Sequence, residues 1–143
     1  MMETAEIRKR LCRTLDEAKR AAAARRRLAA AAEQDGVRVL AEVAAPLFKT
    51  VASFLKAEKY PFLVSTPYEA VRLASETSSE NFIELAIETT TDLPAIVGRV
   101  SRTWGRRILT NETVVAEGTD IANLNDEDVL AFLLKALPPF VER

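Results

Sequence analysis

Residues 81–88 read NFIELAIE, and apolar and polar side chains alternate along this stretch. Ile83, Leu85 and Ile87 fall on one side of an extended chain, whereas two glutamates and an alanine fall on the other. A period of two is typical of a strand with one buried face. Antiparallel sheets commonly bury one face and leave the other in water, so the stretch indicates an antiparallel sheet.

Similar short runs lie on both sides of this stretch and are separated by turn residues. Turns are expected at Thr66-Pro67, at 78–80 and at 89–94, and residues 103–106 are typical of a hairpin tip. This regular spacing predicts an antiparallel meander. The strands that we expect are residues 62–65, 69–75, 81–88, 95–102 and 107–115.

Opposite charges share the polar face of the predicted sheet, at Arg72, Glu84, Glu88 and Arg99. Such pairs on neighbouring strands contribute roughly 0.2–1 kcal/mol each. That is enough to set the strand register and too little to indicate a reactive site.

Two helices are expected before the sheet. Residues 3–34 are rich in alanine and arginine, which both have high helix propensity. Gly36 predicts the end of this helix, because glycine favours the position after a helix C-terminus. A second helix with a wide apolar stripe follows over 37–59. Pro46 predicts either a kink in that helix or a new start near Ala45.

A last helix is expected after the sheet. Asn125 is a favourable N-cap residue, and the three acids that follow it suit the positive end of a helix dipole. The helix is apolar on most sides, so it should lie across the buried face of the sheet until Pro138-Pro139 ends or redirects it.

These elements predict an α+β fold: two N-terminal helices, an antiparallel meander of four to five strands, and a C-terminal helix packed on one sheet face. Residues 1–36 would form a basic Ala/Arg-rich helical arm. Residues 37–143 would form a single α+β domain, which is long enough to bury a core.

Charge is distributed unevenly along the chain, although the formal net charge is −1. Residues 1–28 hold nine Lys/Arg and four Asp/Glu and carry +5, so residues 29–143 carry −6. A basic segment on an acidic body indicates that the segment has its own partner or folds back on the body.

The first helix also has a narrow apolar stripe. Its members are Ile7, Leu11, Leu15, Ala18, Ala22 and Ala29. At about 1.5 Å per residue the helix would be roughly 45–50 Å long, which is more than a body of this size would cover. We therefore expect part of it to project or to pair with a second chain, most simply in a homodimer with this helix at or near the seam.

The chain lacks most of the residues that build active sites: it has no histidine, one cysteine and four glycines. Metal sites, nucleophile–base pairs and phosphate loops depend on these residue types. We therefore expect no enzymatic activity, no cofactor and no metal. An enzyme would need an unusual site built from carboxylates or a lysine. Cys12 has no partner for an internal disulfide, which fits a reducing, cytoplasmic location. No apolar run reaches the roughly 18 residues that a membrane span needs, so no membrane partner is expected.

Two basic groups remain as candidate interaction residues. The first surrounds the tryptophan of the predicted hairpin and consists of Arg99, Arg102, Trp104, Arg106 and Arg107. The second lies on the first helix and consists of Arg25, Arg26 and Arg27. Arginine matches phosphate or carboxylate groups, and tryptophan anchors protein interfaces or stacks on bases.

These observations predict a non-catalytic protein-interaction module, an adaptor or chaperone-like protein. It would bind an unidentified protein partner through the polar sheet face and the tryptophan hairpin, and it would associate with itself. The alternative is a nucleic-acid-binding protein that uses the basic first helix together with the Arg-rich hairpin.

Overall fold

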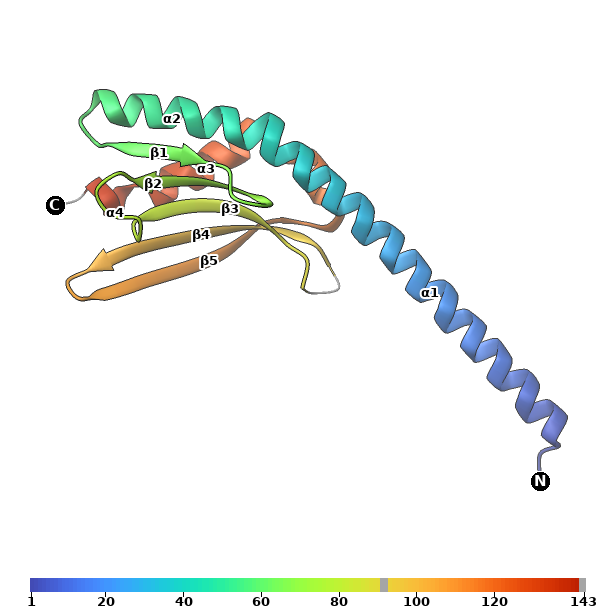
Figure 1. Ribbon diagram of the computed structural model, residues 1–143. Coiled ribbons are helices and arrows are strands. Elements are labelled where there is room, and N and C mark those ends of the chain that lie inside the picture. The colour runs from blue at the N-terminus through green and yellow to red at the C-terminus, as the bar shows by residue number, and fades with distance from the viewer. Residues whose placement is uncertain (91–92, 142–143) are drawn as a thin grey trace.

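The fold class predicted from the sequence is confirmed. The computed structural model describes residues 1–90 and 93–141, and it has N-terminal helices, a five-stranded antiparallel sheet and C-terminal helices (Figure 1). The turn predicted at 89–94 includes residues 91–92, which lie outside the described residues.

The sheet is a meander in which each strand pairs antiparallel with the next one along the chain. The predicted strand positions are confirmed to within two residues at each end. The strands are β1 (Phe62–Ser65), β2 (Ala70–Ser75), β3 (Phe82–Glu88), β4 (Ala95–Trp104) and β5 (Arg107–Glu117). The register pairs Leu73 with Ile83, and Glu84 with both Arg72 and Arg99. The alternation seen in the sequence therefore separates an apolar face from a charged face.

Large apolar side chains on one face of the sheet form the core. Leu73, Ile83 and Leu85 are fully buried there, together with Phe48 from the N-terminal helices and Leu133 from the C-terminal helices. The helices therefore cover this face, and the charged face is left to solvent.

The N-terminal helices run on without a break where the sequence predicts one. Helix α1 spans Thr4–Val39, and a π-helical turn at Leu40–Ala44 joins it to α2 (Ala45–Ala57). The predicted helix end at Asp35-Gly36 is wrong. Gly36 is buried inside α1, where an added Cβ would lie 3.1 Å from the Ile87 side chain. The glycine thus permits close contact between helix and sheet instead of ending the helix.

The second alternative for Pro46 is confirmed, because α2 begins at Ala45 with the proline in its first turn. Proline has no N–H to donate to the carbonyl four residues back, and its ring would clash with that carbonyl in a regular helix. The wider π-helical turn just before it relieves this conflict, and the helical chain bends where α1 meets α2 (Figure 1).

The C-terminal segment closes the core. A 3-10 turn at Gly118–Asn123 leads to α3 (Asp126–Ala136) and to the short α4 (Pro138–Val141). The predicted N-cap is confirmed: the Asn125 side chain accepts a hydrogen bond from the Asp128 N–H, and the Asp128 side chain accepts one from the Asn125 N–H. Phe140 of α4 returns to the core and meets Phe62 edge-on, with ring centroids 5.9 Å apart.

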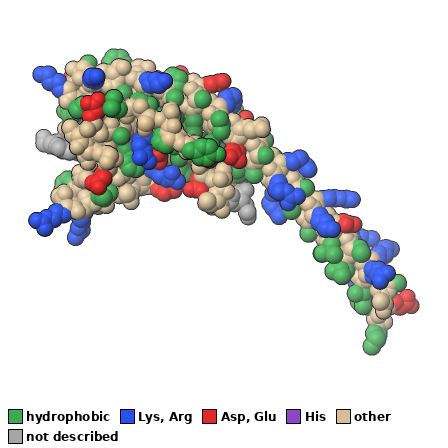
Figure 2. Space-filling model, in the orientation of Figure 1, with side chains coloured by type: hydrophobic (Ala, Val, Ile, Leu, Met, Phe, Trp, Pro, Cys, Tyr) green, Lys and Arg blue, Asp and Glu red, His purple; other side chains and the backbone are tan. Residues whose placement is uncertain are grey.

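Much of α1 projects away from this body (Figure 1). Every residue up to Ala21 is exposed, and buried positions on α1 begin only at Ala32, near the contact with the 3-10 turn. Lys and Arg side chains stand along the projecting segment (Figure 2). None of the helices described is long and apolar enough to cross a bilayer.

Candidate functional site

The tip of the β4–β5 hairpin is set by a two-residue turn. Trp104 pairs with Arg107, which leaves Gly105 and Arg106 as the turn residues. Gly105 has φ of 61°, a conformation that side-chain-bearing residues rarely adopt. Glycine at the first central position favours a type II′ turn, which matches the twist of the two strands.

Trp104 stands out from the hairpin with 64% of its surface exposed. The Arg102 guanidinium lies 5.3 Å from the centre of its ring, within the range of a cation–π contact. The two residues are two positions apart on β4, so they share one side of the strand. Arg106 and Arg107 are exposed beside them.

A groove of about 370 Å³ lies between this hairpin and the C-terminal helices. We call it the hairpin groove. Its apolar lining comes from Val100, Leu109, Phe132, Ala136 and Pro139, its cations are Arg102 and Lys135, and its other polar residues are Thr110, Asn111 and Thr113.

Close packing of α3 on β4 shapes the floor of the hairpin groove. The Phe132 ring lies directly over Gly98, where an added Cβ would come within 2.2 Å of the ring. The outer half of the hairpin extends past this contact, so Leu109 stays partly exposed beside the helix.

Strand β5 forms the long edge of the sheet and the wall of the hairpin groove. It pairs only with β4, so the outer side of its backbone has no strand partner among the described residues. Residues 107–114 are all exposed, and they include the apolar Ile108, Leu109 and Val114. An open edge of this length can pair with another extended chain.

The hairpin groove has a positive electrostatic character. Arg102 and Lys135 both line it, and neither forms an ion pair within the described part of the chain. Two cations beside an apolar floor suit a ligand that carries a carboxylate close to apolar groups.

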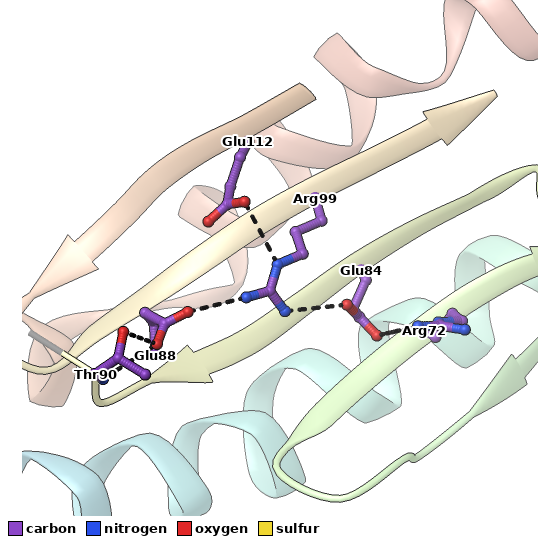
Figure 3. Close-up of polar contacts among 6 residues, drawn as sticks. All are labelled: Arg72, Glu84, Glu88, Thr90, Arg99 and Glu112. Atoms are coloured by element: carbon purple, nitrogen blue, oxygen red, sulfur yellow. Dashed lines mark hydrogen bonds and ion pairs between the residues drawn. The ribbon is translucent and has the colours of Figure 1, made fainter. Parts of the chain in front are cut away.

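Arg99 belongs to a different arrangement on the other face of the sheet (Figure 3). Its nitrogens lie 3.5 Å from Glu84, 3.1 Å from Glu88 and 3.7 Å from Glu112. Glu84 also accepts hydrogen bonds from Arg72 at 2.8 and 3.0 Å.

These contacts confirm the ion pairs that the sequence predicts on this face. The Glu84 side chain is only 5% exposed, and its two oxygens are shared between two guanidinium groups. The carboxylates and guanidinium groups of this face therefore form ion pairs with one another. Arg99 is thus separated from the other candidate residues of the hairpin.

Glu88, the last residue of β3, is a further carboxylate of this ion-pair network. Both the hydroxyl and the backbone N–H of Thr90 donate to Glu88 Oε1, at 2.7 and 3.1 Å. These hydrogen bonds, with a smaller contribution from Arg99, lower the pKa of Glu88 below its ordinary value because they favour the charged carboxylate.

Arg25, Arg26 and Arg27 are exposed on α1, near the point where it leaves the body. The hairpin tip lies at the opposite end of the body (Figure 1). The structure thus brings Arg102, Trp104, Arg106 and Arg107 together, but it keeps them apart from the three arginines of the helix.

Sequence reasoning missed the residues that α3 contributes to the hairpin groove, namely Phe132 and Lys135. Alternation along β5 does place Leu109, Asn111 and Thr113 on one side of that strand. Nothing local in the sequence indicates that α3 crosses beside them.

No set of three His, Cys, Asp or Glu side chains suited to hold a metal ion occurs in residues 1–90 and 93–141. Comparisons of the chain with protein-family models, with curated proteins and with solved structures found no match.

Proposed function

We propose that this protein is a non-catalytic interaction module that captures an extended segment of a partner protein along β5. The observation that carries the proposal is the open edge of β5 beside the hairpin groove. Backbone hydrogen bonds to such an edge supply affinity, and pockets for alternate side chains supply specificity. An adaptor or chaperone-like role in the cytoplasm fits this kind of binding.

The chemistry of the hairpin groove indicates the kind of segment. Val100, Leu109 and Phe132 suit an apolar side chain, and Arg102 with Lys135 suits a nearby carboxylate. Trp104 extends the same side of β4 as a large exposed aromatic anchor. We therefore expect an extended peptide in which an apolar residue and an acidic residue lie on the same side.

The test is a selection of displayed random ten-residue peptides against the full-length protein, followed by titration of a labelled synthetic peptide. Trp104 is the only tryptophan, so its fluorescence also reports on binding at the hairpin. Trp104→Ala and Arg102→Gln should each weaken binding about tenfold or more, which corresponds to about 1.4 kcal/mol. Circular dichroism should show that both variants remain folded.

Tyr68→Ala is the matched control, because Tyr68 is a highly exposed aromatic residue in the turn between β1 and β2, outside the hairpin groove. It should leave the affinity unchanged. Peptides that bind equally well to the Trp104→Ala and Arg102→Gln variants would place the interaction elsewhere and contradict the proposal.

Nucleic-acid binding is the second candidate, and the exposed cations of α1 favour it. Lys9, Arg13, Arg20 and Arg27 follow steps of four and seven, so they share one helix face. None of these four forms an ion pair with any residue that the structure describes. A row of unpaired cations suits contact with several phosphates in succession.

Fluorescence anisotropy of labelled duplex and single-stranded DNA and RNA tests this candidate. Binding should weaken steeply as salt is raised, because each phosphate contact releases counterions. A variant with Arg13→Glu, Arg20→Glu and Arg27→Glu should lose it. Absence of binding at low salt would exclude the candidate and leave the peptide-binding proposal unaffected.

A further inference from the structure

The apolar stripe on the projecting segment of α1 is covered by none of the residues that the structure describes. Ile7, Leu11 and Leu15 are 51%, 55% and 49% exposed, and Ala18 follows on the same line. Half-exposed leucines and isoleucines at steps of four and three are typical of a helix that packs against another helix.

The same line of residues packs α1 on its own body farther along. Ala32, Gly36 and Val39 continue the steps of three and four and are buried against the sheet and the 3-10 turn. One continuous face of α1 is therefore built for close packing, and the body covers only its second half.

A hollow lies where the projecting segment of α1 joins the body, at the end of the covered half of this face. It has a volume of about 460 Å³, and Arg25, Leu28, Ala29 and Ala32 of α1 line it beside Asp120. A helix that lay along the uncovered stripe would run directly into this hollow.

We propose that the occupant of the stripe is the same segment of a second copy of this chain, running antiparallel to it over residues 3–26. In the register that uses the whole stripe, Ile7 faces the partner's Ala22, and Leu11 faces the partner's Ala18. Leu15 then lies beside the two-fold axis. Met1 and Met2 of each chain reach the hollow on the other.

The sizes of the side chains favour this register over a parallel one. The layers on either side of the centre pair a large side chain with an alanine, and only the central layer holds two large side chains, the Leu15 residues around the two-fold axis. A parallel pair would place isoleucine against isoleucine at the tip and alanine against alanine near the body. Those layers need different axial separations, and both bodies would have to share one end.

Charges along one flank of the antiparallel pair also match. Glu3 comes opposite the partner's Arg25, and Arg10 comes opposite the partner's Glu17. The row of Lys9, Arg13, Arg20 and Arg27 remains on the outside, away from the seam. Because each N-terminal segment still carries +5 in total, the pairing should strengthen as salt is raised, whereas nucleic-acid binding weakens.

The register is tested by disulfide trapping in a Cys12→Ala background of the full-length chain. One preparation carries Ile7→Cys and the other carries Ala22→Cys, and the two are mixed and oxidised. A crosslinked dimer with one chain of each kind should form rapidly, because the two thiols face each other in the proposed register.

Leu11→Cys alone, in the same background, is the matched control. The thiols of two such chains would lie about 10 Å apart along the axis, at roughly 1.5 Å per residue, which is too far for a disulfide. Rapid crosslinking of Leu11→Cys or of Ile7→Cys with itself would indicate a parallel or shifted pairing and would overturn the proposal.

Sedimentation velocity gives the second test. The unmodified protein should be a reversible dimer, and Leu11→Glu with Leu15→Glu should be a monomer whose circular dichroism retains the signal of the folded body. A monomeric unmodified protein at all concentrations would overturn the proposal. Peptide binding at the hairpin groove should be equal in both proteins, so failure of one proposal does not decide the other.

Discussion

At the scale of single residues, Glu84 connects the ion pairs on the exposed face of the sheet. Its side chain is almost fully buried between Arg72 and Arg99, whereas Glu112 is 59% exposed at the margin of the same network. Removing one partner of a buried ion pair lowers the free energy of unfolding far more than removing one partner of an exposed ion pair. The reason is that the charges left behind in the buried pair lose their compensation.

Glu84→Gln should therefore lower the free energy of unfolding by about 2 kcal/mol, the size expected for buried hydrogen bonds to charged groups. Glu112→Gln should change it by less than about 0.5 kcal/mol. Urea unfolding of both variants measures the difference. Equal losses would mean that the buried position of Glu84 has no energetic consequence.

A second residue-scale prediction concerns Glu33 of α1, which lies close to Glu69 in the turn between β1 and β2. A hydrogen bond with the Glu69 carboxyl, then repulsion from its charge, and then loss of hydration raise the pKa of Glu33 above its ordinary value. The folded protein thus holds the Glu33 proton more tightly than the unfolded chain does. The stabilisation that this bound proton gives the folded state is complete at pH values below the pKa of Glu33 in the unfolded chain. It is lost as the pH rises through the pKa of Glu33 in the folded protein.

Glu33→Gln should consequently stabilise the protein at pH 7, where the unmodified carboxylate is repelled by Glu69. The gain should disappear at pH values below the ordinary range of a glutamate, where the Glu33 carboxyl is protonated. Thermal unfolding at several pH values measures this trend. The same gain at acidic and neutral pH would show that charge repulsion is not its cause.

At the scale of elements, the contact between α3 and β4 depends on Gly98. An alanine Cβ would come within 2.2 Å of the Phe132 ring, so the helix would have to move or the ring would have to turn. Overpacking of this kind typically costs about 1–3 kcal/mol. Gly98→Ala should show that loss in urea unfolding.

The loss should be smaller when Phe132→Ala is already present, because the ring that causes the clash is gone. A double-mutant cycle over the two positions measures this coupling. If the two losses simply added, the contact between the ring and the glycine would not be the source of the cost.

The elements also show which features of the fold local sequence signals can predict. Alternation in 82–88 and the capping residues around Asn125 are local signals, and the structure confirms both. Gly36 is a local helix-stop signal that tertiary structure overrides, because Ile87 and Ile96 approach the helix at that point from far along the chain.

The same limit applies to the candidate site. Trp104 and Arg102 were found because they are close in sequence at a hairpin tip. Phe132 and Lys135 join them only through the path of α3 across the sheet. Local patterns identify the residues of one hairpin, but they do not reveal which helix completes a groove.

At the scale of the whole molecule, α1 gives the protein an extended shape. Its first half reaches away from one end of the body, while the β4–β5 hairpin lies at the opposite end (Figure 1). In the proposed antiparallel dimer the overlapping segments would span about 36 Å at roughly 1.5 Å per residue, with one body at each end. The two hairpin grooves would then point outward, where each can receive a partner.

Small-angle X-ray scattering should detect this arrangement without any crosslink. The distance distribution of the unmodified protein should have two maxima, one from distances within a body and one from distances between the two bodies. The variant with Leu11→Glu and Leu15→Glu should lose the second maximum, because these charges cannot be buried at the seam. A single maximum for a dimer of the unmodified protein would mean that the bodies lie side by side, which is incompatible with antiparallel pairing of α1.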